Sequence, residues 1–318
     1  MVLLFILLHL ITDEMIGEYH LLAHNNHVLD GINKDVGPLY SLEEAKDYFL
    51  KLAEGWEDPY GEPKITTHDG IRVVRDDYLV GSKVRGGDCL ISSLPESIDT
   101  IVYVQPRTGL AGVSILDVAK RHNKDVMLFM PSSKRISHHQ ACCIERGAKV
   151  EFHRIAAMPN LNLIAQKWAS ERSNAFFVPL GLKHEKVTAG IVKTASQIDE
   201  PEEVYVATST GVLTRALQIA WPNAKFTSVC VSRNMKAGEL GRATPISHPY
   251  AFTKEEDKDL WPPFPTIGTY DAKVWRFINK EEAKHKDILF WNVGTEPELK
   301  DETIYDRINS YRDWPKKA

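Results

Sequence analysis

Short apolar segments alternate with segments of helical period from residue 71 to residue 232, and this alternation constrains the fold more than any other feature. The apolar segments, such as TIVYV at 100–104, contain few alternating polar residues. Strands that are apolar on both faces are typical of parallel sheets covered by helices. The pattern therefore predicts an α/β fold with parallel sheets. The predicted strands are 71–75, 100–104, 125–130, 149–153, 175–178, 203–207, 226–232 and 287–292, and the predicted helices are 110–122, 137–147, 160–172, 187–197 and 211–221.

The length of 318 residues is sufficient for two lobes, each with its own core. Residues 233–269 are rich in proline and charge, and we expect irregular structure with short helices there. The polar tail after Thr295 is expected to be peripheral. Residues 1–11 are apolar except for His9, but they are too few to cross a bilayer, and no basic segment precedes them as in a signal peptide. We interpret them as a buried helix or strand of the larger lobe, or as an artefact of start-codon choice, and expect no membrane association.

Charge and cysteine content exclude other classes of protein. The formal net charge is −4, so no overall basic field indicates a nucleic-acid-binding protein, although a local basic groove is not excluded. The four cysteines form neither a CxxC pair nor the spacing of a disulfide framework. This pattern predicts a reducing, cytoplasmic environment.

The first loop whose residues could take part in a reaction follows the predicted strand 71–75. Two aspartates and a glycine turn precede Ser82 and Lys83, which open a predicted helix. A helix N-terminus disfavours a positive charge and so depresses the pKa of a lysine, which suits a nucleophilic amine. An isolated Ser-Lys pair is also explained by a surface lysine beside acidic neighbours.

Two further strand-to-helix loops carry polar groups, and ligands of parallel sheets bind in such loops. The loop from Gln105 to Gly109 could bind an anion such as a carboxylate, or could be a turn capped by Thr108. The loop containing Thr208, Ser209, Thr210 and Gly211 offers three hydroxyls at a helix start, which suits a phosphate, although capping alone would explain one of them. It is neither a Walker loop nor GxGxxG.

Taken in order, these loops resemble one group of enzymes. The run from Val74 to Arg85 is similar to the RDD…GxNKxRK segment of aminocyclopropane-carboxylate deaminase and D-cysteine desulfhydrase, and Ser82 to Gly86 to the SFKxRGA of threonine dehydratases. Pro106 to Gly109 falls at the place of the SGNTG loop, and Thr208 to Val212 at the place of the glycine-rich phosphate cup. The sequence therefore resembles the pyridoxal-phosphate (PLP) enzymes of the tryptophan synthase β-like fold.

The resemblance implies specific roles for the residues of these loops. Lys83 would hold PLP as a Schiff base and move the proton at the substrate α-carbon. The cofactor phosphate would be held by Thr208, Ser209, Thr210, Gly211 and Val212, and the substrate carboxylate by Thr108 and Gly109. The resemblance also implies two lobes. The large, cofactor-binding lobe would comprise 1–88 and 185–318, and the small lobe 89–184.

The sequence departs from the family pattern in three loops. Arg107 replaces the asparagine that contacts the ring hydroxyl, and could pair with that phenolate or with an acidic substrate group. The glycine-rich phosphate cup is replaced by the run from Thr208 to Gly211. The closing HTGG-type turn is replaced by Asn292 to Thr295, and either Asn292 or Thr295 could contact the pyridine nitrogen. Tyr270, which we also count as a substrate-binding candidate, or Trp275 could stack near the ring.

The function implied is a PLP-dependent lyase that breaks a bond at the α-carbon of an amino acid, by elimination with deamination or by decarboxylation. Two alternatives stay open. The same chemistry could act on an aminoacyl-modified thymine in bacteriophage DNA, since three loops depart from those of free-amino-acid enzymes; or the chain could be a non-catalytic scaffold. A homodimer is expected because dimers are common in this fold group.

Histidines and cysteines do not form a convincing metal site. His138 and Cys142 share one face of a predicted helix, but no second pair of ligands is apparent. His20, His24 and His27 are partly at helical spacing, and packing explains them better than a metal. The sequence therefore predicts no metal ion.

Overall fold

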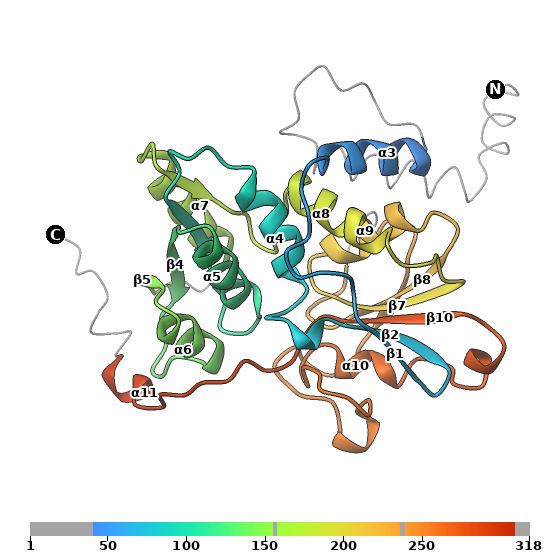
Figure 1. The fold of residues 1–318 in the computed structure, drawn as a ribbon. Helices are drawn as coiled ribbons and strands as arrows, with labels where there is room; N and C mark the ends of the chain where they lie inside the picture. The colour runs from blue at the N-terminus through green and yellow to red at the C-terminus, as the bar shows by residue number, and fades with distance from the viewer. Residues whose placement is uncertain (1–40, 155–157, 236–238, 309–318) are drawn as a thin grey trace, which may run out of the picture.

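The computed structural model describes residues 41–154, 158–235 and 239–308 (Figure 1). The apolar segment 1–11 and the histidines at 20, 24 and 27 lie outside these ranges. The strands are β1 Ile65–His68, β2 Ile71–Arg75, β3 Thr100–Val104, β4 Asp125–Pro131, β5 Lys149–His153, β6 Ala175–Phe177, β7 Glu203–Thr208, β8 Lys225–Cys230, β9 Thr244–Ser247 and β10 Ile288–Asn292. The α-helices are α3 Leu42–Leu52, α4 Lys83–Ser92, α5 Ala111–Arg121, α6 His138–Glu145, α7 Met158–Ser170, α8 Glu185–Ala195, α9 Val212–Ala220, α10 Ala272–Trp275 and α11 Ile304–Arg307, and the 3₁₀ turns are η1 Asp76–Tyr78, η2 Lys258–Leu260 and η3 Glu282–Lys284.

The strands form two sheets. One has six strands in the order β1-β2-β10-β7-β8-β9, and the other has four in the order β5-β4-β3-β6. Every pair is parallel except β1 with β2. In Figure 1, α3, α8 and α9 lie on one side of the six-stranded sheet and α10 on the other. The prediction of parallel sheets with crossover helices is confirmed.

All four strands of the second sheet lie within 89–184, the predicted small lobe, whose boundaries stay a prediction. The boundary placed after residue 88 falls inside α4. This helix contacts both α5 and α8, and in Figure 1 it lies between the two sheets. Its first residue is Lys83, so the candidate amine lies where the two halves of the molecule meet.

Two strands at the edges of the larger sheet escape prediction from the sequence. β1 has only four residues, and none of its side chains is fully buried, so it lacks an apolar run. β9 contains Pro245 within the proline-rich segment, and proline is tolerated at a sheet edge because one side of the strand needs no hydrogen-bond donors. The tail after Thr295 includes α11, which contacts α6, and its Ile304 is buried.

Within the described ranges, no helix combines the length and the apolar character needed to cross a membrane.

Candidate functional site

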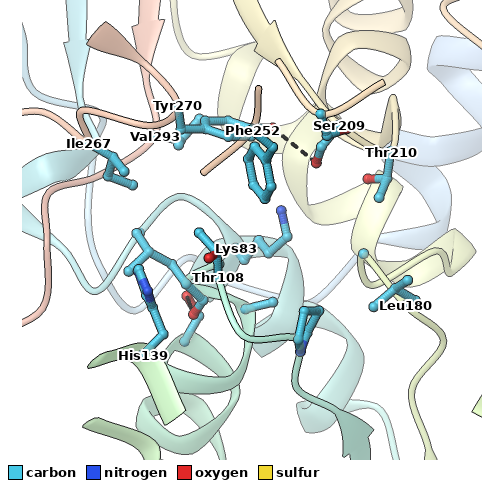
Figure 2. A pocket seen from close by; sticks show the side chains of 18 of the residues that line it. Lys83, Thr108, His139, Leu180, Ser209, Thr210, Phe252, Ile267, Tyr270 and Val293 are labelled. Atoms are coloured by element: carbon cyan, nitrogen blue, oxygen red, sulfur yellow. Dashed lines mark hydrogen bonds between the residues drawn. The ribbon is translucent and has the colours of Figure 1, made fainter. Parts of the chain in front are cut away.

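A cavity of about 600 Å³ opens where the strand-end loops of the two sheets meet (Figure 2). All three loops singled out in the sequence contribute to its wall. They provide Lys83 from the first loop, Thr108 and Gly109 from the second, and Ser209 and Thr210 from the third. The structure thus brings together side chains that are far apart in sequence. Tyr270 and mostly apolar side chains complete the wall, among them Leu110, Met158, Leu180, Phe252 and Ile267.

The Lys83 side chain reaches into this cavity from the first turn of α4 (Figure 2). Its amine forms no hydrogen bond with the described part of the chain. Burial lowers the pKa of Lys83, and the nearby carboxylate of Asp271 acts in the opposite direction. A lysine without a partner in a mostly apolar cavity is favoured in its neutral form, which is the nucleophilic form of an amine.

The aspartates that precede Lys83 are buried rather than exposed. Arg75 forms a bidentate ion pair with Asp77, with N–O distances of 2.7 and 2.8 Å. Asp76 accepts hydrogen bonds from Arg85 at 3.2 Å and from the indole of Trp291 at 2.8 Å. Buried charges are stable only when paired in this way. These bonds tie the loop before Lys83 to β10 on one side and to the first turn of α4 on the other, so they fix where the amine lies.

The hydroxyl-rich turn forms the opposite part of the wall, at the start of α9. Gly211 has a φ of +75°, and a Cβ there would lie 2.3 Å from the Glu239 carbonyl oxygen, so only glycine fits. Ser209 and Thr210 line the cavity, and the Ser209 hydroxyl lies 3.4 Å from that of Tyr270. Two hydroxyls at a helix N-terminus can receive an anion such as a phosphate.

The similarity of this chain to known proteins lies in its fold. No protein-family model and no curated protein matches the sequence. Solved structures do match. The chain is similar to an ACC deaminase homologue, with a TM-score of 0.65, 15% identity, and coverage of 77% of this chain and 94% of the other. It is also similar to threonine deaminase isoform 2 from Solanum lycopersicum, with a TM-score of 0.61, 12% identity, and coverage of 83% of this chain and 92% of the other. A pyridoxal 5′-phosphate-dependent aspartate racemase matches with a TM-score of 0.55, 12% identity, and coverage of 79% of this chain and 96% of the other.

The chain adopts the tryptophan synthase β-like fold. The fold expected from the order of the three loops is therefore confirmed, although sequence identity to these structures is only 12–15%. At that level of identity the likeness establishes the fold alone. The chemistry that the site can perform therefore depends on its own side chains.

Several other candidate site residues lie outside the cavity wall. Thr208 is 1% exposed, and its hydroxyl lies 2.6 Å from the hydroxyls of both Thr214 and Ser228. Gly211 and Val212 form the start of α9 behind the wall. Asn292 is buried and donates to Asp77 at 2.8 Å, so its amide supports the loop before the amine.

Three more candidates are also placed away from the cavity. Arg107 is exposed, and its guanidinium donates to the backbone carbonyl of Arg135 at 3.3 Å. Thr295 is partly buried but does not line the cavity. Trp275 is buried in an aromatic cluster, with its ring 5.3 Å from that of Phe264. Of the two aromatic candidates, Tyr270 alone contributes to the wall.

Asp271 is a residue that the sequence does not reveal. It is 0% exposed, and both of its carboxylate oxygens lack a hydrogen-bond partner in the described structure. Burial raises the pKa of Asp271 well above its usual range; the backbone of Val293 and the charge of Lys83 oppose this shift. An unpaired buried carboxyl group close to a buried amine is costly for a protein to maintain. No motif marks it, because it follows Tyr270 just after the proline-rich segment 233–269, where the sequence has no regular pattern.

Replacing Asp271 by asparagine should stabilise the protein without cofactor at neutral pH. A folded-state pKa raised above the unfolded value makes folding less favourable as the pH rises above about 4. Asparagine does not titrate, so the variant's advantage in free energy of unfolding should be smallest at pH 4 and exceed about 1 kcal/mol at pH 7. Urea unfolding at several pH values measures it.

The exposed Asp259 gives the matched control, since Asp259→Asn should change the stability little at any pH. An advantage for Asp271→Asn that does not vary with pH would show that the carboxyl group is not strained by burial.

His138 and Cys142 on α6 have a structural role. His138 Nε2 lies 2.7 Å from the carbonyl oxygen of Pro297 and 3.6 Å from the sulfur of Cys142. Ser137 caps this helix through a capping box with Gln140. In the ranges described, no cluster of three or more His, Cys, Asp or Glu side chains is placed to hold a metal ion.

Proposed function

We propose that the chain is a PLP-dependent enzyme that acts at the α-carbon of an amino-acid group. The observation that carries this proposal is the Lys83 amine, which has no partner in the described structure and faces a cavity of about 600 Å³ walled in part by a hydroxyl-rich helix start. A lysine whose pKa is lowered by burial and whose amine has no partner in the described structure suits covalent attachment to an aldehyde. The shared fold with PLP-dependent enzymes supports the same conclusion.

The residues present fit the parts of this cofactor. The amine of Lys83 suits the aldehyde, and the turn containing Ser209 and Thr210 suits the phosphate. Asp271 is buried next to Tyr270 of the cavity wall, and its two carboxylate oxygens have no partner in the described structure. It therefore suits a protonated pyridine nitrogen, which would give this carboxylate a positively charged donor. Together these groups would hold the cofactor at its two ends and on its ring.

When bound, PLP supplies an electron sink for a carbanion at the substrate α-carbon, while the protein decides which bond breaks. Lys83 would remove or return the proton at that carbon. The second loop, with Thr108 and Gly109 at the cavity wall, would bind the substrate carboxylate. The mostly apolar remainder of the wall would exclude water from the reacting centre. We propose elimination with deamination as the overall reaction, with decarboxylation as the alternative outcome at the same carbon.

An absorbance titration with PLP tests the proposal. The purified protein should develop a visible band that saturates at one cofactor per chain, and the band should change when a turned-over amino acid is added. The ligand panel should contain D- and L-amino acids, together with aminoacyl-modified thymine nucleosides and DNA carrying them. A protein that takes up no PLP would refute the proposal, whereas a response to the modified nucleosides alone would favour the DNA-directed alternative.

A further inference from the structure

A second titratable side chain faces the cavity from a different helix. His139, the second residue of α6, is 6% exposed and lines the cavity. Figure 2 shows it apart from Lys83, with Thr108 drawn between them. In the assignment above, Thr108 contacts the substrate carboxylate. His139 therefore lies on the side of the cavity that is left for the rest of the substrate.

His139 offers a neutral hydrogen-bonding group there. Burial, and to a lesser extent the charge of His138, lowers the pKa of His139 to about 4, so the ring is uncharged at pH 7. Its Nε2 atom lies 3.3 Å from a carboxylate oxygen of Glu296. A neighbouring carboxylate favours the tautomer with the proton on Nε2, which leaves Nδ1 as a hydrogen-bond acceptor.

The surroundings of His139 disfavour an anion. The Glu296 side chain is 40% exposed and contributes negative charge directly behind the ring. Arg107, the cation that could have paired with an acidic substrate group, is exposed and outside the cavity wall. Arg233 also lines the cavity, but its guanidinium is paired with the Glu239 carboxylate at 2.6 and 2.8 Å. Most of the remaining wall is apolar, so His139 is a favourable partner for a polar group of the substrate.

We propose that His139, backed by Glu296, determines substrate specificity: it accepts a hydrogen bond from a donor group on the substrate side chain, such as a hydroxyl, amide or ammonium, and disfavours a side-chain carboxylate. This inference rests on the proposed function, because it takes the substrate carboxylate to lie at Thr108. It narrows the substrate class from amino-acid groups in general to those with a neutral or cationic donor on the side chain.

Near-isosteric substrate pairs test this proposal on the PLP-loaded protein. Asparagine with aspartate, glutamine with glutamate, and threonine with valine differ mainly in the group that His139 would contact. The wild-type protein should prefer the donor-bearing member of each pair in kcat/KM. His139→Leu should lower kcat/KM for that member by about 10²-fold, chiefly through KM, because the interaction is made in the ground state as well. His139→Gln, which keeps an acceptor, should recover part of the loss.

His122 provides the matched control, since it also faces a carboxylate, Asp88 at 2.9 Å, but lies outside the cavity wall. His122→Leu should leave the substrate preference unchanged. Calorimetric binding of the same amino acids gives a second readout that does not depend on turnover.

The possible failures are distinguishable. Preference for aspartate or glutamate in the wild type, or an unchanged preference in His139→Leu with a normal PLP absorbance band, would overturn the role of His139 and leave the proposed function standing. The absence of any PLP band in the wild type would overturn both.

Discussion

Replacement of Lys83 by alanine should abolish turnover, with a loss of at least about 10³-fold in kcat/KM. The expected loss is large because one amine would serve both as the attachment point of the cofactor and as the acid–base group at the substrate α-carbon. The visible absorbance band of the PLP-loaded protein should be lost or displaced in parallel. Lys83→Arg should be as inactive as the alanine variant, because a guanidinium keeps the charge but is not a nucleophile.

Lys149 is the control for this experiment. It is 63% exposed and pairs with Asp125 on the surface, so Lys149→Ala should retain full activity and the normal band. The removal of a partly buried lysine that forms no hydrogen bond in the described structure should leave the fold intact, and circular dichroism checks this. Turnover that survives in Lys83→Ala would show that this amine is not the catalytic group.

Much of the fold was predictable because it depends on local pattern. Apolar strands buried on both faces and separated by helices of regular period leave few alternatives to parallel sheets. The positions of Lys83, Thr108 and Ser209 in one cavity follow from the same logic, since the loops after parallel strands gather at one edge of each sheet.

The remainder of the site depends on tertiary contacts that no local pattern records. Asp271 is buried next to Tyr270 of the cavity wall, and His139 lines the cavity from the first turn of a helix. Nothing in either sequence context separates these two residues from surface residues. Three adjacent hydroxyl residues also do not all face one ligand. Thr208 ends β7 and bonds to Thr214 in α9, whereas Ser209, the next residue, turns to the cavity.

The position of the Lys83 amine also depends on how closely α4 approaches α8. Gly86 is buried at this contact, and a Cβ there would lie 2.6 Å from the backbone oxygen of Val187. Gly190 lies on the facing helix, where an added Cβ would meet the Gly86 Cα at 3.1 Å. Because the obstacle at Gly86 is main chain, no side-chain rotation can make room for even a methyl group.

Gly86→Ala should therefore lower the free energy of unfolding by about 1–3 kcal/mol despite the higher helix propensity of alanine. The neighbouring Gly87 on the same helix is the matched control, because its added Cβ would meet Leu182 at an ordinary 3.6 Å. Gly87→Ala should be neutral or stabilising by up to about 1 kcal/mol. Urea unfolding of the two variants without PLP compares them directly. Since α4 carries Lys83, Gly86→Ala should also weaken PLP binding. Equal free energies of unfolding for Gly86→Ala and Gly87→Ala would mean that α4 and α8 are not packed through their glycines.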